Sequence, residues 1–320
     1  MIVESPLELI FHNLFYRLRD FVGLHDVFLK LEGLNISGSI KMKTAIGLVE
    51  DLEKRGLARP NETVIVESSS GNLGIALSLV CAVKGYEFIC VTDPNANRTN
   101  VRGMELYGAK VIIVNERDNA GGFLGTRIKT INQIVDENPN AVWVNQYANV
   151  ANKNVHAKQT ANEIAAEFEK VDWVFVGAGT TGTLAGVGER LHQLFPKIKV
   201  VAVDPVGSVT FGGEPGTRKI PGIGTSLRPK LADYAKPDRV IAIDEERTVE
   251  SCLSFVRDYH MLVGGSTGTV LAAIKELAPE FEPGDTVVAI SPDLGEKYID
   301  TVYDPVWVEK VIKEKLEAAV

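Results

Sequence analysis

The stretch "WVFVGAGTTGTLAGVGERLHQLF", residues 173–195, decides the fold class. It begins with an apolar run, continues through a turn rich in glycine and threonine, and ends in a segment with helical spacing. A second apolar run, "KVVAVD", follows at residues 199–204. A strand, a turn, a helix and another strand in this order predict a parallel βαβ unit.

Further apolar runs predict strands at residues 63–67, 88–92, 110–114, 239–244 and 286–291. Because nearly every residue in these runs is apolar, we expect helices on both faces of each strand. The runs fall into two blocks, so the expected fold is α/β, with two doubly wound parallel-sheet domains. We expect a small domain at residues 36–140 and a large domain formed by residues 1–35 and 141–320. Ligands of such sheets bind at the carboxyl ends of the strands, which favours a site between the domains.

The composition excludes several classes of protein. The chain has 320 residues, 45% of them hydrophobic and 24% charged, which is ordinary for a globular protein. Its net charge of -8 argues against a nucleic-acid partner. The three cysteines form no metal-binding pattern, so we expect no metal and a reducing, cytoplasmic location. No apolar run is long enough to span a bilayer, and no secretory signal is evident, so no membrane partner is expected.

Three segments that follow apolar runs have a composition suited to binding an anion. They are "ESSSGNLG" (Glu67–Gly74), "GAGTTGT" (Gly177–Thr183) and "GGSTGT" (Gly264–Thr269). Glycine lets the backbone approach a ligand, and the helix that follows presents free N–H groups and the positive end of its dipole. These turns predict phosphate binding. For any single turn, simple capping of the helix by serine or threonine is the better explanation, but three such turns in one chain weaken it.

One of these turns also matches a dinucleotide-binding pattern. Gly177, Gly179 and Gly182 fit G-x-G-x-x-G, and Asp204 ends the next strand, where an acid could bind a ribose. An NAD-dependent dehydrogenase is therefore one hypothesis. The sequence offers no evident acid or base for hydride transfer, and such an enzyme has no need of Lys41 in "NISGSIKMK" (Asn35–Lys43).

Several segments, in order from about Phe28 to Tyr303, resemble fold-type II pyridoxal-phosphate enzymes of the cysteine synthase family. "NISGSIKMK" is similar to the segment whose lysine holds the cofactor as an imine and moves the Cα proton, which implies these roles for Lys41. "SSSGNLG" resembles the loop that binds the substrate carboxylate. The resemblance implies that Ser69, Ser70 and Gly71 are its donors and that Asn72 meets the phenolic oxygen of the cofactor.

The same resemblance covers the second half of the chain. "NQYAN" matches a segment whose glutamine, here Gln146, also contacts the substrate carboxylate. "PGIGTS" is similar to a flexible segment near the site, around Gly222. "GGSTG" places Ser266 beside the pyridine nitrogen, which favours loss of a β-leaving group over transamination. "GTTGT" resembles the loop that binds the cofactor phosphate, which implies this role for Gly179, Thr180, Thr181, Gly182 and Thr183.

The sequence departs from ordinary cysteine synthases at three positions. Met42 and Lys43 stand where Asp-Arg is usual, Thr181 replaces a third glycine, and Leu73 replaces a threonine. The whole set of motifs looks most similar to the N-(2-amino-2-carboxyethyl)-L-glutamate synthases of 2,3-diaminopropionate biosynthesis, from siderophore and peptide-antibiotic pathways. This branch implies a homodimer that acts on O-phospho-L-serine and L-glutamate and releases phosphate.

Two residues are candidates for binding the anionic groups of these substrates. Arg127 in "GGFLGTR" can bind the substrate phosphate or a carboxylate of glutamate, and Tyr147 can line the same pocket; an exposed arginine and a packed aromatic are the alternatives. Arg228 is a weaker candidate. Lys43 could lower the pKa of Lys41, unless it points elsewhere from the helix. The other functions considered are a cysteine synthase that combines sulfide with O-acetyl- or O-phosphoserine and a catalytically silent regulatory or binding protein on the same scaffold.

Overall fold

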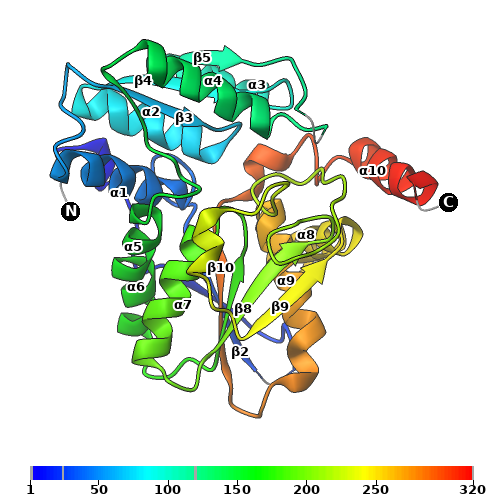
Figure 1. The fold of residues 1–320 in the computed structure, drawn as a ribbon. Coiled ribbons are helices and arrows are strands. Elements are labelled where there is room, and N and C mark those ends of the chain that lie inside the picture. Colours follow the sequence, from blue (N-terminus) through cyan, green and yellow to red (C-terminus); the bar gives the residue numbers. More distant parts are fainter. Residues whose placement is uncertain (1–2, 24, 119–120, 319–320) are drawn as a thin grey trace. The chain divides into compact units, whose positions relative to one another are not determined.

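The computed structural model describes residues 3–23, 25–118 and 121–318 (Figure 1). Its contacts divide the chain into two compact units. Unit 1 comprises the N-terminal residues up to Ile10 together with Asn35–Val155, and unit 2 comprises Phe11–Leu34 together with the chain from His156 onward. No helix of the described residues is long and apolar enough to cross a membrane.

Unit 1 contains a four-stranded, fully parallel sheet with the strand order β5-β4-β3-β6. The sequence analysis predicted three of these strands and missed the shortest one, β6, which pairs with β3. This pairing extends unit 1 beyond residue 140, the boundary expected for the small domain. The strands are β3 (Val64–Ser68), β4 (Glu87–Thr92), β5 (Lys110–Ile113) and β6 (Ala141–Trp143).

Helices cover both faces of this sheet, as the apolar strands predicted. Ile65 of β3 and Cys90 of β4 are buried in one apolar cluster with α1 and α2. Val66 and Val91, the next residues along the same strands, are buried in a second cluster with Ile131 of α4. The helices are α1 (Lys41–Lys54), α2 (Asn72–Lys84), α3 (Arg98–Leu106), α4 (Leu124–Glu137) and the first part of α5 (Ala151–Lys158), with a 3₁₀ turn at Pro6–Glu8.

Unit 2 contains a six-stranded sheet with the strand order β1-β2-β10-β7-β8-β9. All neighbouring strands are parallel except β1, which pairs with β2 in the antiparallel sense. The strands are β1 (Phe15–Leu18), β2 (Asp26–Leu31), β7 (Trp173–Gly177), β8 (Lys199–Pro205), β9 (Arg239–Ile243) and β10 (Thr286–Ser291). Both β7 and β10 have the bounds expected from the sequence.

The helices of unit 2 also lie on two faces of their sheet. Phe175 of β7 and Val201 of β8 are buried in a large apolar cluster with α9. Gly188 of α7 approaches Val200, which points to the other face. The helices are α6 (Thr160–Glu167), α7 (Gly182–Leu194), α8 (Glu245–Tyr259), α9 (Gly265–Leu277) and α10 (Pro305–Ala318), with 3₁₀ turns at Lys230–Asp233, Ala278–Glu280 and Gly295–Tyr298.

Each sheet contains a point at which the strand order reverses. In unit 1 the chain moves outward from β3 to β4 and β5 and then returns to place β6 on the other side of β3. In unit 2 it moves from β7 to β8 and β9 and then places β10 beside β7. A crevice forms at the carboxyl ends of strands where the order reverses, and ligands of α/β sheets bind there. The segments after β3 and β7 are therefore the places to look for a site.

Candidate active site

Lys41 is the first residue of α1, and a compact turn fixes its position. Asn35 closes this turn: its Oδ1 accepts a hydrogen bond from Ser37 N at 2.9 Å, and its Nδ2 donates to Ser39 O at 2.8 Å. Ser39 Oγ then accepts a hydrogen bond from Lys41 N at 3.3 Å. Gly38 has a φ of +69°, which glycine adopts without strain. Lys41 itself is half-buried, whereas Lys43 is fully buried, so Lys43 is not a solvated surface lysine.

The loop after β3 is organised by Ser69. The Oγ of Ser69 accepts hydrogen bonds from Gly74 N at 2.9 Å and from Gly71 N at 3.3 Å. The Ser69 hydroxyl therefore holds the start of α2, where the sequence analysis expected a donor to substrate. Ser70 and Asn72 are half-buried on either side of Gly71. The loop thus presents its backbone at the amino end of a helix, an arrangement suited to a carboxylate.

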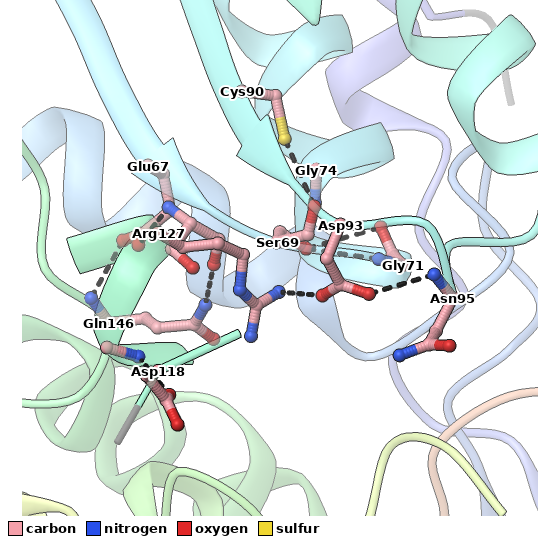
Figure 2. A network of polar contacts seen from close by, with 12 residues as sticks. Glu67, Ser69, Gly71, Gly74, Cys90, Asp93, Asn95, Asp118, Arg127 and Gln146 are labelled. Atoms are coloured by element: carbon pink, nitrogen blue, oxygen red, sulfur yellow. Dashed lines mark hydrogen bonds and ion pairs between the residues drawn. The ribbon is translucent and has the colours of Figure 1, made fainter. Parts of the chain in front are cut away.

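Gln146 lies beside this loop, in the segment after β6. Its Nε2 donates to Ser68 O at 2.9 Å, and its backbone N–H donates to Glu67 Oε2 at 2.9 Å (Figure 2). Its carbonyl accepts a hydrogen bond from Asn152 Nδ2 at 2.9 Å, and Asn152 also contacts Thr44 of α1 at 3.4 Å. Unit 1 therefore brings Gln146 together with the Ser69–Asn72 loop.

Arg127 is buried at the start of α4, only 11% of its side chain being exposed. Asp118 fixes this helix start by accepting hydrogen bonds from Gly122 N at 3.0 Å and Gly125 N at 2.8 Å. The guanidinium Nη1 pairs with Asp93 Oδ2 at 3.2 Å (Figure 2), and the buried Nε has no hydrogen-bond partner among the described residues. The alternative that Arg127 is an exposed surface residue is therefore wrong.

Burial changes the acidity of two groups near Arg127. Burial raises the pKa of Glu67 to about 7, although the N–H groups that face it and the charge of Arg127 lower it. Burial also raises the pKa of Tyr147 to about 12, and Arg127 acts against this shift while Glu67 and Asp93 add to it. Tyr147 therefore stays protonated and can donate a hydrogen bond to an anion.

In unit 2, the turn between β7 and α7 contains the predicted phosphate loop. Thr181 precedes α7 with a φ of +64°, a left-handed conformation that strains a β-branched residue. This position is the one at which cysteine synthases carry a glycine. The side chain of Thr181 makes no capping hydrogen bond to α7, and the turn presents the start of this helix, including Gly182 and Thr183, in an arrangement suited to an anion. A side chain at Gly179 would approach Gly222 O at 3.2 Å, so the turn lies directly against the "PGIGTS" segment.

Ser266 is buried in the first turn of α9. A hydrogen bond of 3.0 Å between the hydroxyls of Thr267 and Ser291 joins this turn to the end of β10. A side chain at Gly264 would collide with the carboxylate of Asp293, which explains the glycine. Unit 2 therefore presents the Thr-rich turn after β7 and Ser266 at the start of α9. Arg228 belongs to neither of these two segments. Its side chain is half-exposed and pairs with Asp233 at 2.6 Å.

The sequence analysis missed two acidic residues of unit 1. Glu67 was quoted within the loop motif but received no role, and Asp93, the partner of Arg127, was not singled out. Both lie at the carboxyl ends of neighbouring parallel strands, β3 and β4. A carboxylate at the end of an otherwise apolar strand is the signal that could have identified them.

Comparison with known proteins decides between the two cofactor hypotheses. Residues 14–293 match the family described as "Pyridoxal-phosphate dependent enzyme". The chain belongs to this family. Its fold is that of the fold-type II enzymes, and its cofactor is pyridoxal phosphate. The NAD hypothesis is therefore wrong, and Asp204 has no ribose to bind; burial raises the pKa of its carboxyl to about 6.

Solved structures of several pyridoxal-phosphate enzymes are similar to this one. O-ureido-L-serine synthase is 29% identical with a TM-score of 0.87, covering 96% of each chain. An O-acetylserine-dependent cystathionine beta-synthase from Helicobacter pylori is 27% identical with a TM-score of 0.87, covering 94% of this chain and 98% of its own. A hydrogen sulfide-producing enzyme from Fusobacterium nucleatum is 30% identical with a TM-score of 0.86, covering 93% and 98%. The chain is thus an enzyme of the cysteine synthase type.

The residues of the chain fit this cofactor. Pyridoxal phosphate needs an amine for its aldehyde and a set of donors for its phosphate. Lys41, at the start of α1, can supply the amine. The uncapped start of α7 and the close approach of Gly179 to Gly222 form a narrow turn rich in N–H donors, which suits the phosphate.

Proposed function

We propose that the enzyme joins O-phospho-L-serine and L-glutamate to form N-(2-amino-2-carboxyethyl)-L-glutamate and releases phosphate. The observation that carries this proposal is the buried cation Arg127. Its Nε has no partner among the described residues, and its pairing with Asp93 leaves donors for an anion of the substrate. A phosphate leaving group and a dicarboxylic nucleophile both require such a cation, whereas an acetyl group and sulfide do not. The product would be a precursor of 2,3-diaminopropionate in siderophores or peptide natural products.

We assign the cofactor to residues of both units. The cofactor supplies a ring that withdraws electrons from Cα of an amino acid and so weakens the bond to the β-leaving group. Lys41 would hold it and move the Cα proton. Asn72 would donate to its phenolic oxygen, and Ser266 would face its pyridine nitrogen. The residues that would bind its phosphate are Gly179, Thr180, Thr181, Gly182 and Thr183.

The amino-acid substrate would be held mainly by residues of unit 1. Ser69, Ser70, Gly71 and Gln146 would bind its α-carboxylate, because they border the start of α2. Arg127 and Tyr147 would bind the phosphate of O-phosphoserine or a carboxylate of glutamate, and Gly222 would line the site near the cofactor. Each of these groups is a hydrogen-bond donor or a small residue that leaves room for one.

A cysteine synthase that uses sulfide is the second candidate. It is favoured by the solved relatives, one of which is O-acetylserine-dependent and another of which produces hydrogen sulfide. The two functions differ in the nucleophile, which is glutamate in one and sulfide in the other. The choice of nucleophile therefore separates them, and a variant of Arg127 tests whether the first substrate carries a phosphate.

The test combines substrate choice with one substitution. The enzyme loaded with pyridoxal phosphate is mixed with O-phospho-L-serine, and then with glutamate or sulfide, while released phosphate and the amino-acid product are measured. The Arg127→Gln variant should need roughly 10- to 100-fold more O-phosphoserine, the loss expected for hydrogen bonds to a charged group. Arg102→Gln, an exposed arginine paired with Glu105 at 3.2 Å in the same unit, is the matched control and should behave as the wild type. A wild-type enzyme that forms product only with sulfide refutes the glutamate assignment.

We also propose that the enzyme is a cytoplasmic homodimer. Leu9 and Ile36 are 40% and 43% exposed and lie on adjacent backbone segments, where Ile36 N donates to Leu9 O at 3.3 Å. This exposed apolar pair would be covered by a second copy of the chain. All three cysteines are free and buried, in agreement with a reducing compartment. Light scattering of the purified protein should give the mass of two chains, and a monomeric mass refutes the dimer.

A further inference from the structure

The carboxyl group of Glu67 accepts hydrogen bonds from three N–H groups at the end of β3. Its Oε1 accepts hydrogen bonds from Ser68 N at 2.6 Å and from Trp143 Nε1 at 3.1 Å. Its Oε2 accepts the hydrogen bond from Gln146 N at 2.9 Å (Figure 2). The side chain is completely buried. A buried carboxyl group is unfavourable unless it is well bonded, so its retention here calls for a specific explanation.

These bonds join two segments that are far apart in the sequence. Gln146 lies 79 residues from Glu67, and it is tied to β3 a second time by its Nε2, which donates to Ser68 O. The loop Ser69–Asn72 begins directly after Ser68. The orientation of this loop relative to Gln146 therefore depends on two side chains, those of Glu67 and of Gln146 itself.

We infer that Glu67 is a positioning residue that holds the Ser69–Gly71 loop and Gln146 in the geometry needed to bind the α-carboxylate of the amino-acid substrate. This inference rests on the proposed function, which assigns both segments to that carboxylate. Glu67 does not touch the substrate itself in this scheme. It acts through the backbone N–H groups of Ser68 and Gln146.

The arrangement requires two acceptor oxygens, which glutamine cannot supply. In a Glu67→Gln variant one oxygen becomes an NH₂ group, so an N–H donor must face another donor whichever way the amide turns. If the NH₂ faces Gln146 N, the hydrogen bond from Gln146 N is lost and the bond from Gln146 Nε2 to Ser68 O remains; if it faces Ser68 N and Trp143 Nε1, the start of the loop is displaced. Either outcome shifts the two halves of the carboxylate site relative to each other, while the volume of the side chain is nearly unchanged.

The alternative explanation is that Glu67 only stabilises the fold of unit 1. Such a role would weaken the binding of every ligand alike, or of none. A role in positioning the carboxylate contacts would weaken only ligands that have an α-carboxylate. A pair of ligands that differ in this group alone distinguishes the two.

The experiment measures binding of O-phospho-L-serine and O-phosphoethanolamine, which have the same phosphate and amine but differ in the carboxylate. Each is titrated into the enzyme loaded with pyridoxal phosphate, and the absorbance change of the bound cofactor gives the dissociation constant. Glu67→Gln should raise the dissociation constant of O-phosphoserine about 10-fold, which corresponds to the loss of roughly one hydrogen bond. The dissociation constant of O-phosphoethanolamine should change less than about 2-fold. Glu53→Gln is the matched control, because Glu53 accepts hydrogen bonds from Lys84 at 2.8 Å and Tyr86 at 3.1 Å in the same unit; it should change neither constant.

Equal weakening of both ligands, or no change in either, overturns the inference. Glu67→Asp keeps the charge on a shorter side chain and should show the same selectivity, so it decides the question if the glutamine variant does not fold. If the wild-type enzyme does not respond to O-phosphoserine, the proposed substrate is wrong. The positioning role is then tested on the same variants with L-serine and ethanolamine, which again differ only in the carboxylate.

Discussion

Replacing Glu67 by glutamine should change how the stability of the protein depends on pH. Burial raises the pKa of this carboxyl from 4.5 to about 7 in the folded protein. The folded state therefore binds a proton more tightly than the unfolded state, and this contribution to stability is complete below about pH 4.5 and lost as the pH rises to about 7. From the two pKa values, the free energy of unfolding should lose roughly 2–3 kcal/mol between about pH 5 and about pH 8 through this group alone.

Glutamine does not titrate, so the variant should lack this loss. Urea unfolding of the wild type, Glu67→Gln and the control Glu53→Gln at both pH values gives the free energies. Other titrating groups, Asp204 among them, are common to all three proteins and cancel in the differences between them. The wild type and the control should lose stability together, and Glu67→Gln should lose roughly 2–3 kcal/mol less. Parallel pH profiles for the wild type and Glu67→Gln would refute a buried carboxyl group with a raised pKa.

Four further substitutions test other parts of the structure. Lys41→Ala should abolish the covalent mass added to the protein when the cofactor-loaded enzyme is reduced with borohydride, as read by mass spectrometry. Gly74→Ala should destabilise the protein by about 1–3 kcal/mol in urea unfolding, because the new Cβ would lie 2.5 Å from Met104 Sδ. Gly103→Ala is its control: nothing lies within 4 Å of the new Cβ, so this substitution should stabilise helix α3 slightly. His260→Gly should raise the melting temperature, since His260 ends α8 with a φ of +57°, and glycine removes about 1 kcal/mol of strain there.

The strands that the sequence predicted are those that can be recognised from the pattern of their own residues. A parallel strand covered on both faces must be apolar throughout, and this pattern identified β7 and β10 with their observed bounds. Strands β1 and β6, which the sequence analysis did not predict, lack the pattern. Strand β6 has only three residues, and β1 pairs with a single neighbour and is partly exposed. Their positions depend on partners elsewhere in the chain, which spacing alone does not reveal.

The candidate site was predictable to a similar extent. Turn composition predicted three anion-binding turns, because glycine and a following helix are visible in the sequence, and in the structure a helix follows or begins in each of them. The left-handed conformation of Thr181 and the burial of Arg127 were not visible, since both depend on packing. Family resemblance supplied Lys41 as the cofactor lysine, a role that no local pattern could establish.

The importance of Glu67 follows from topology and not from its neighbours in sequence. A glutamate that ends an apolar strand would be exposed at the edge of a sheet if no strand followed on that side. Here the chain returns after α4 and inserts β6 next to β3, so that Trp143 and Gln146 cover the carboxyl group and supply two of its three donors. The reversal of strand order therefore has two effects. It places the expected ligand-binding crevice at the end of β3, and it buries Glu67, the residue that we infer to position the Ser69–Gly71 loop and Gln146 beside this crevice. In other doubly wound sheets, an acidic residue that ends the strand at such a reversal should in the same way orient the ligand-binding loops from behind.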